Sequence, residues 1–436
     1  MGARADGRGA DGRPGCLTFG LRFVNGLALT SVVLFAVSVT GCTGSSGGGE
    51  RAPSRSQNTS ISAEVEPSSG ASSAARGPAR LTGKFTASPL VFQNARIGLV
   101  TIGGSLEHHQ REVSSWQERT SDGGRTWTVG PVAHTGIGRN PTPVPSTQIG
   151  LAFGSNSGAW AYQPSLFFTR DGGLSWQPEP VRPAGVGPVA VSGSSTWITG
   201  YPCRSLGCHS RLFQTDRVGG SLTLLPAQPT RSGEIDVLLR PSRTTAWVVT
   251  SDARGRQQLI TTADEGRSWQ PRSLPCRARD RFDISGDRPT ALYLICISPS
   301  LSMCDSCGAR TLYRSSDNGV DWMRVTSSPT PAYGPRTPAQ FVQAVGTSTL
   351  WAVNTTQIGT GTLLRSTDRG SSWQRVLGTT SRPLATESFF AADAQHAWVV
   401  ALTPSRADGI RFTVYRTSDG GRHWNNTLLP IPETLH

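Results

Sequence analysis

The segment Thr120-Ser121-Asp122-Gly123-Gly124-Arg125-Thr126-Trp127 decides the fold, because its pattern returns along the chain. We call this pattern the Asp frame. It consists of a hydroxyl residue, an aspartate two positions later, a glycine two positions after that and a tryptophan three positions further on. Good copies occupy residues 120–127, 169–176, 262–269, 315–322, 366–373 and 417–424, and a worn copy without its tryptophan lies near Thr215-Asp216. Successive aspartates are 45 to 53 residues apart, a regular spacing that indicates a repeat architecture.

A second repeated feature gives the number of strands in each unit. Apolar segments such as Ala246-Trp247-Val248-Val249 precede the frames, and further apolar segments such as Leu151-Ala152-Phe153 lie ahead of those as expected first strands. Short apolar runs bounded by turn residues predict strands. Each unit therefore predicts four antiparallel strands, with the Asp frame between the third and the fourth. Seven units predict an all-β fold, a seven-bladed β-propeller over residues 82–436.

Turn and core chemistry account for the residues of the frame. An aspartate carboxylate accepts backbone N–H bonds that close a tight turn, and glycine tolerates the positive φ of such a turn. Tryptophan fills the contact between neighbouring units. Eleven of the 12 tryptophans occupy two repeated positions, and only Trp116 does not. We therefore predict structural rather than catalytic roles for Asp122, Trp127, Asp171, Trp176, Asp264, Trp269, Asp317, Trp322, Asp368, Trp373, Asp419 and Trp424.

The Asp frame resembles the Asp box, or BNR repeat, of the sialidase-like propellers, and the resemblance covers residues 84–436. The chain is most similar to single-ring proteins without a hydrolase site, namely the photosystem II assembly/stability factor family and the YVTN/BNR-like propellers of exported actinobacterial lipoproteins. That resemblance implies non-catalytic binding or assembly through the face that carries the long loops.

The alternative function is an exo-sialidase-type glycoside hydrolase. Sialidases place an arginine in an Arg-Ile-Pro motif before the first Asp box, whereas this chain has Arg96-Ile97-Gly98 there. Tyr333, Glu179 and Glu234 offer a tyrosine and carboxylates, but no spacing assigns a nucleophile and its partner. The sequence therefore assigns no catalytic residue.

Long loops are expected on the face opposite the Asp frames, which we call the loop face. We expect residues 101–115, 251–257 and 403–410 to join second to third strands there, and residues 272–281 to connect consecutive units. Arginines gather on these loops, and a positive surface attracts anionic ligands; a solvated rim is the other interpretation. The candidate anion-binding residues are Arg139, Arg182, Arg254, Arg279, Arg336 and Arg382.

The overall charge excludes some functions and leaves others open. The net charge is +13, but Lys84 is the only lysine among 42 basic residues. We therefore expect no lysine-dependent mechanism, such as that of a Schiff-base enzyme. Such a preference for arginine reflects composition rather than a nucleic-acid-binding domain, and we expect no nucleic-acid partner. We also expect a monomer, no cofactor and no metal, with an unknown protein or glycan as ligand.

The N-terminal 41 residues predict a lipoprotein signal peptide. Arginines precede an apolar run from Leu27 to Val39, which is too short for a membrane span of ~20 residues. The run ends at Val39-Thr40-Gly41-Cys42, which resembles the bacterial lipobox. Residues 42–81 then comprise the lipidated Cys42 and a Ser/Gly-rich flexible linker. We expect an extracytoplasmic protein, anchored to the cell membrane through lipid on Cys42.

Apart from Cys16 and Cys42 the chain has six cysteines, and this even number favours disulfides in a chain expected to be exported. Cys203 and Cys208 flank the tip of an expected hairpin and form the first predicted pair. Three pairings remain open among Cys276, Cys296, Cys304 and Cys307. The single C-x-x-C at Cys304 and Cys307 lacks the second pair that a zinc ribbon requires.

The anchor prediction is tested by mass spectrometry of the protein extracted from its native membrane. We expect the mature chain to begin at a Cys42 that carries a diacylglyceryl group. An unmodified Cys42, or a mature N-terminus elsewhere, contradicts the prediction.

Overall fold

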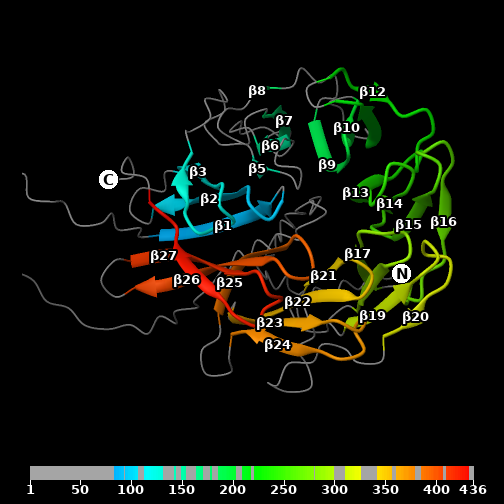
Figure 1. The fold of residues 1–436 in the computed structure, drawn as a ribbon. Helices are drawn as coiled ribbons and strands as arrows, with labels where there is room; N and C mark the ends of the chain where they lie inside the picture. Colours follow the sequence, from blue (N-terminus) through cyan, green and yellow to red (C-terminus); the bar gives the residue numbers. More distant parts are fainter. Residues whose placement is uncertain are drawn as a thin grey trace, which may run out of the picture.

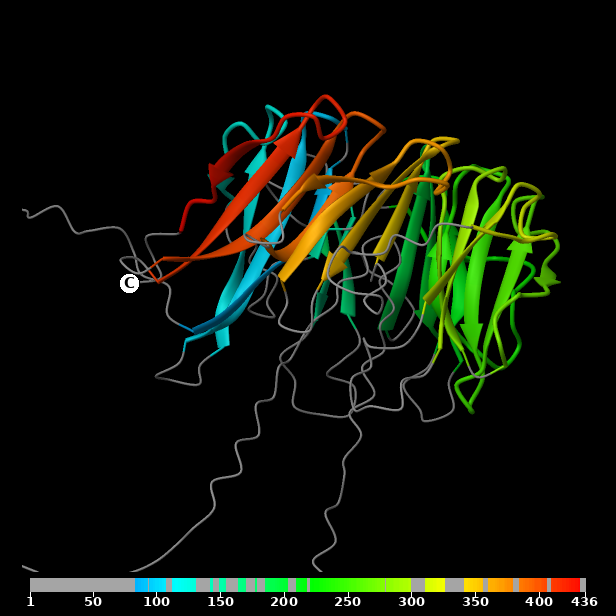
Figure 2. The ribbon, with the colours of Figure 1, turned by 90° about the horizontal axis from the view of Figure 1, so that it is seen from below.

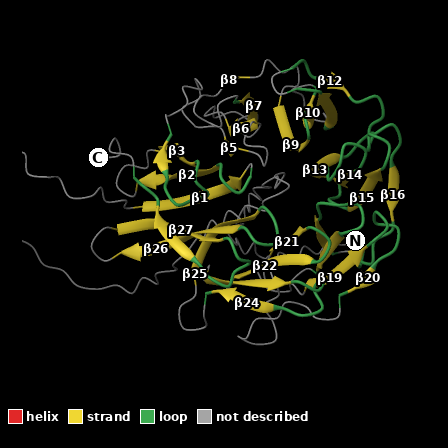
Figure 3. Ribbon diagram, viewed as in Figure 1, coloured by secondary structure: helices red, strands yellow, loops and turns green. Residues whose placement is uncertain are grey.

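The computed structural model describes residues 83–92, 94–106, 112–130, 142–143, 149–153, 164–169, 177–178, 185–202, 209–217, 220–278, 280–298, 310–325, 341–355, 360–378, 384–405 and 409–431. All regular structure in these ranges is β-strand (Figure 3). None of the residues in these ranges forms a helix long and apolar enough to cross a membrane.

The described strands fall into seven sets of four consecutive antiparallel strands, which we call blades 1 to 7; blades 6 and 7 are joined into one sheet, because β23 also pairs with β25. Blade 1 comprises β1 (Gly83–Phe92), β2 (Gly98–Leu106), β3 (Glu112–Thr120) and β4 (Thr128–Val129). Blade 2 comprises β5 (Thr142–Pro143), β6 (Ile149–Phe153), β7 (Pro164–Phe168) and β8 (Gln177–Pro178). Blade 3 comprises β9 (Gly185–Ser192), β10 (Ser195–Tyr201), β11 (Arg211–Thr215) and β12 (Thr223–Leu224).

The remaining four blades follow the same order. Blade 4 comprises β13 (Glu234–Leu239), β14 (Ala246–Ser251), β15 (Gln257–Thr262) and β16 (Gln270–Arg272). Blade 5 comprises β17 (Arg281–Ser285), β18 (Leu292–Ile297), β19 (Arg310–Ser315) and β20 (Met323–Arg324). Blade 6 comprises β21 (Phe341–Val345), β22 (Thr349–Thr355), β23 (Thr360–Ser366) and β24 (Gln374–Leu377). Blade 7 comprises β25 (Leu384–Ala391), β26 (Ala397–Ser405), β27 (Gly409–Thr417) and β28 (Asn425–Leu428).

The blades are arranged in a ring, which defines a β-propeller (Figure 1). First strands such as β9, β13 and β17 lie toward the middle of the ring, and fourth strands such as β12, β16 and β20 lie at its rim. The first and last blades are neighbours, since β1 contacts β25, β26 and β27 (Figures 1 and 2). A closed ring leaves few long exposed strand edges.

The Asp frames form the turns between third and fourth strands. In blade 1 the amides of Arg125 and Thr126 donate to Asp122 Oδ1 at 2.9 and 3.0 Å, and the Gly124 amide donates to Thr120 Oγ1 at 2.8 Å. Equivalent bonds surround Asp264, Asp317, Asp368 and Asp419. The frame glycines of these five turns have φ between 76° and 91°, where a side chain is strained. The predicted turn chemistry is therefore confirmed in the frames that the structure describes.

In the worn copy of the frame in blade 3, Asp216 lies one position too early, and Arg217 occupies the position of the frame aspartate. There the Thr215 hydroxyl donates to the carbonyl of Arg217, two residues later, at 2.8 Å, and this bond closes the turn.

In blades 3, 4, 6 and 7 the second strand carries a tryptophan that packs against the Asp frame of the following blade. These tryptophans are at most 1% exposed. The described pairs are Trp197 with Trp269, Trp247 with Asn318, Trp351 with Trp424, and Trp398 with Gly123. Frame tryptophans also reach back across the junction: Trp322 Nε1 donates to the Ser273 carbonyl at 3.1 Å, just after the preceding blade's fourth strand. The two repeated tryptophan positions therefore hold neighbouring blades together.

At most described junctions, a side chain of the preceding blade accepts a hydrogen bond from a backbone N–H on the first strand of the following blade. An inner strand has a second strand on one side only, so some of its amides need a partner elsewhere. The Ser210 hydroxyl, for example, accepts from the Ile235 amide at 2.7 Å. The other amide–acceptor pairs are Phe282 with Gln257, Ala344 with Ser285, Ala391 with Gln343, and Leu90 with Ser388.

Three local expectations were wrong. Leu151–Phe153 belongs to β6, the second strand of blade 2, and β5 precedes it. Both inner strands of a blade are apolar, so hydrophobicity alone could not order them. The expected loops at 101–115 and 403–410 are largely strand, because β2 and β3 pair from Ser105 and Glu112 onward and β26 pairs with β27 up to Ser405.

Replacing Trp247 with alanine tests the role of the second-strand tryptophans. We expect Trp247→Ala to lower the free energy of unfolding by about 3–5 kcal/mol, because it empties a fully buried site between blades 4 and 5. Guanidinium unfolding of the full chain measures this loss. Trp247→Phe is the matched control and should lose less, since it retains most of the buried ring. A loss below about 1 kcal/mol for the alanine variant would rule out this role.

Candidate functional site

The direction of the strands places specific residues at the loop face. First and third strands begin at this face, and second strands end there, because neighbouring strands are antiparallel. In blades 3 to 5 the strand ends at this face are Tyr201, Ser251, Arg281 and Arg310, together with Glu234. These residues come from blades that are adjacent in the ring (Figure 1).

A group of interacting polar side chains lies at these strand ends, and we call it the loop-face cluster. It contains Tyr201, Glu234, Asp236, Ser251 and Gln257. Burial and a hydrogen bond with Glu234 raise the pKa of the Tyr201 hydroxyl. The Ser251 hydroxyl donates to Asp236 Oδ1 at 3.2 Å, and Gln257 also bonds to this carboxylate. The cluster therefore presents a phenol, a hydroxyl, an amide and two carboxylates within a partly buried surface.

Burial raises the pKa of Asp236, and the neighbouring Glu234 charge adds to this effect. The bonds from Ser251 and Gln257, and the positive charge of Arg281, oppose it. Because Asp236 is only partly buried and only partly neutralised by its neighbours, its carboxylate can accept hydrogen bonds from a ligand that replaces surface water.

The arginines beside the cluster already have partners. Arg211 donates to the carbonyls of Thr230 and Arg231, each at 3.1 Å. Arg281 is attracted to Asp236. Burial lowers the pKa of Arg310, and the charge of Asp283 opposes that shift. An arginine bound to a carbonyl or carboxylate is less available to clamp a substrate carboxylate.

Of the six arginines predicted to bind an anion, Arg254 lies within the described residues, exposed in the turn between β14 and β15. Its backbone amide donates to Asp252 Oδ1 at 2.8 Å, and Arg256 Nε lies 2.7 Å from the other oxygen of Asp252. Acidic and basic groups thus alternate at this tip, so it is not a purely positive surface. Five candidates lie outside the described residues: Arg139, Arg182, Arg279, Arg336 and Arg382.

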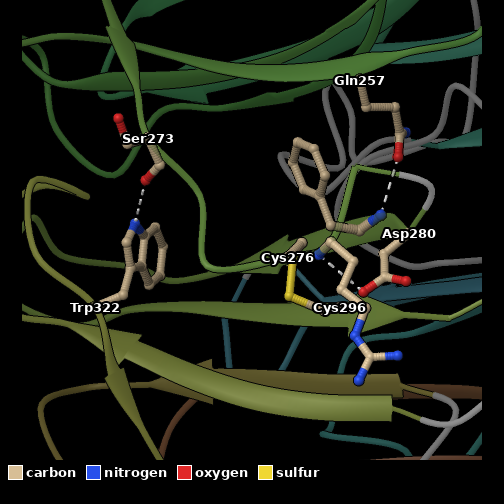
Figure 4. Close-up of a disulfide and its surroundings, with 8 residues drawn as sticks. Gln257, Ser273, Cys276, Asp280, Cys296 and Trp322 are labelled. Atoms are coloured by element: carbon tan, nitrogen blue, oxygen red, sulfur yellow. Dashed lines mark hydrogen bonds between the residues drawn. A yellow bond between two sulfur atoms is a disulfide. The ribbon is translucent and has the colours of Figure 1, made fainter.

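A disulfide between Cys276 and Cys296 links the connection from blade 4 to blade 5 with β18 (Figure 4). This is one of the three pairings that the sequence left open. On the same connection, the Arg277 amide donates to Asp280 at 3.1 Å, and Gln257 accepts from the Phe282 amide at 2.9 Å. The disulfide therefore fixes the segment that leads into Arg281. Cys203, Cys208, Cys304 and Cys307 lie outside the described residues, as does Cys42.

The aspartates of the frames have a different environment. Hydrogen bonds from the Ser268 hydroxyl and amide lower the pKa of Asp264 to about 2, and bonds from Ser372 do the same for Asp368. These carboxylates remain ionised and fully engaged in their turns, which suits a structural role. Asp171 and Trp176 lie outside the described residues.

No group of three or more His, Cys, Asp or Glu side chains within the described ranges could hold a metal ion.

Most of the loop-face cluster was not singled out from the sequence. Glu234 was named only as a carboxylate without a partner, and Tyr201, Asp236 and Arg281 were not assigned a role. The residues lie on different blades, so only the ring brings them together. The one available signal was their position, since each stands at the end of an apolar strand segment.

Comparison with known proteins supports the fold and leaves the activity open. No protein-family profile matches the chain. A xyloglucanase from a Paenibacillus species is 25% identical over 197 residues, which are 40% of this chain and 18% of that enzyme. The chain therefore corresponds to less than a fifth of the length of this relative.

Two solved structures illustrate the structural likeness. YCF48 bound to a D1 peptide is 15% identical with a TM-score of 0.37, over 80% of this chain and 86% of that one. The acylaminoacyl peptidase from Pyrococcus horikoshii is 9% identical with a TM-score of 0.51, over 81% of this chain and 53% of that one. At such identities the likeness concerns the fold alone.

Removing the disulfide tests its effect on the loop face. We expect the Cys276→Ser/Cys296→Ser double variant to lose about 2–4 kcal/mol of unfolding free energy. Hydrogen exchange should rise most in the peptide that spans residues 272–282. Unchanged exchange in this peptide, with the bond shown to be intact in the parent chain, would disprove the predicted constraint.

Proposed function

We propose that the chain is a membrane-tethered, non-catalytic binding protein whose loop-face cluster takes a hydroxyl-rich ligand, a glycan. The tether is the lipid expected on Cys42, followed by the linker of residues 42–81. The observation that carries this proposal is the gathering of Tyr201, Glu234, Asp236 and Gln257 near the loop-face strand ends of blades 3 and 4.

The chemistry of the cluster favours a neutral hydroxyl-rich ligand over an anion. Carboxylates and amide oxygens accept hydrogen bonds from hydroxyl groups, and phenol and amide groups donate to them. The nearby arginines are offset by Asp236 and Asp283 or bound to carbonyls, so little positive charge is left at this place. The sequence similarity to a xyloglucanase is consistent with a glycan as ligand.

The sialidase-type alternative is disfavoured by the placement of the arginines. Arg96, which occupies the position of the sialidase motif, lies in the turn between β1 and β2, and its carbonyl accepts from the Gly123 amide of the Asp frame at 2.8 Å. It is therefore on the face opposite the Tyr201–Glu234 pair. A sialidase needs arginines that converge on the substrate carboxylate beside its nucleophile.

A glycan array with the purified full chain tests the proposal. We expect binding to neutral glycans that weakens about tenfold in Asp236→Asn, since one charge-assisted hydrogen bond contributes roughly 1.5–3 kcal/mol. The matched control is Asp321→Asn, which changes an exposed carboxylate on the opposite face and should bind normally.

A fluorogenic sialoside separates the alternatives. We expect no turnover by the full chain. Turnover that disappears in Tyr201→Phe would contradict the proposal and establish the hydrolase. Silence of the glycan array, combined with no turnover, would refute a glycan ligand.

A further inference from the structure

The junction between blade 7 and blade 1 differs from the others, because it joins the two ends of the ring. Blades that follow one another in the chain are also connected through the backbone. Blade 7 meets blade 1 through packing, including Phe92 stacked on Trp398 at 3.7 Å between centroids, and through bonds such as Thr427 Oγ1 to the Arg125 carbonyl at 3.2 Å. Opening the ring here therefore requires no separation of covalently consecutive blades.

A carboxyl group is buried within this junction. Glu118 on β3 has no exposed surface. It pairs across the sheet with Val100, which belongs to the apolar core shared with Phe390, Trp398 and Val414 of blade 7. Side chains of directly paired residues lie on the same face of a sheet. Glu118 therefore faces blade 7.

The hydrogen bonding of Glu118 is incomplete. Trp116 Nε1 donates to its Oε1 at 2.9 Å, while its Oε2 is buried and has no hydrogen-bond partner. Trp116 is also the one tryptophan outside the repeated positions. Trp116, the tryptophan outside the repeat, and Glu118, the buried carboxyl, thus lie two residues apart on the same face of β3.

The equivalent position in other blades is apolar or aromatic. It lies two residues before the hydroxyl of the frame, and is occupied by Phe213, Ile260, Tyr313, Leu364 and Tyr415 in blades 3 to 7. Burying these apolar and aromatic side chains stabilises the fold, whereas burying a carboxyl destabilises it. The cost rises sharply if the carboxyl ionises. Blade 1 therefore carries a weak point that its sister blades lack.

A second carboxyl bridges the same junction near the loop face. Glu387 on β25 is half-buried and interacts with the Ala87 amide of β1; this contact favours the ionised carboxylate, but burial outweighs it and raises the pKa. The next residue, Ser388, accepts from the Leu90 amide at 2.9 Å. These two contacts cap the inner strand of blade 1.

We propose that this junction is a proton-dependent latch: neutral Glu118 keeps blades 7 and 1 closed together with Glu387, and ionisation of these carboxyls opens the ring there. Burial raises the pKa of Glu118 to about 8, and that of Glu387 to about 7. For a carboxyl whose pKa is raised in the closed state, the stabilisation is complete below its ordinary value of 4.5. It declines as pH rises, until the closed-state pKa is passed. Closure is therefore weakest above about pH 8.

Few other charged groups face this position. From blade 7, Arg416 on β27 points to blade 1, and its guanidinium interacts with Asp122 and Arg125 at the Asp frame. His396, which pairs with Asp393, stacks on Trp398 with 6.4 Å between the ring centroids. Val100, which pairs with Glu118, belongs to an apolar core with Ile102, Phe390 and Val400. Among the residues that the structure describes, no charged side chain acts on the Glu118 carboxyl to offset its ionisation.

Hydrogen exchange of the full chain between pH 6.5 and pH 9 tests the latch, after correction for the intrinsic exchange rate. We expect protection of β1 and β25 to fall at least tenfold relative to β17 and β21, since each pH unit contributes up to a factor of ten. Glu118→Gln should remove most of this dependence, and Glu118→Gln/Glu387→Gln should remove all of it.

Trp116→Phe provides a further readout, because loss of the indole N–H removes a bond that favours the ionised carboxyl. The midpoint of opening should then move to higher pH. If Glu118→Gln does not fold, Glu118→Leu introduces the residue of blade 6 and should likewise remove most of the pH dependence. An equal loss of protection at all junctions, or an unchanged pH dependence in the Gln or Leu variant, would overturn the proposal.

Discussion

The contact between a second-strand tryptophan and the Asp frame of the next blade is the interaction on which the ring depends. A single four-stranded blade cannot bury its apolar faces, so each blade requires its neighbours. The tight turn of the frame allows close approach: a Cβ at Gly124 would lie 3.2 Å from the Trp398 ring. At that junction Trp398 also donates to the Gly123 carbonyl at 2.9 Å. The same glycines therefore serve both the turn and the packing of one blade on the next.

This constraint determines where function can lie. The frame carboxylates are occupied by their turns, and several arginines serve the junctions: Arg240 lies 4.3 Å above the Trp197 ring and Arg365 lies 5.3 Å from the Trp351 ring. Part of the positive charge of the chain therefore belongs to the scaffold. On the loop face, the strand ends of blades 3 and 4 carry the polar groups that can meet a ligand. The latch lies in the one junction without a direct chain connection.

The sequence predicted the architecture because the Asp frame combines a turn and a packing residue at one spacing. It could not assign Leu151–Phe153 to the second strand, since first and second strands are equally apolar. It could not choose Cys276–Cys296 among three pairings, because the choice depends on how the connection to blade 5 folds back on β18. Tyr201 and Asp236 meet only through the ring. Glu118 stands among polar residues in the sequence, and its burial follows from the closure of blade 7 on blade 1.

The central claim is that the loop face, rather than the Asp-frame face, meets the ligand. Site-specific photo-crosslinking of the full chain in its native membrane tests it most directly. One photoreactive residue would replace Gln258, which is exposed next to the loop-face cluster, and another would replace Arg369, which is exposed in the frame of blade 6. The account predicts adducts from position 258 and none from position 369. Adducts from position 369 alone would contradict it.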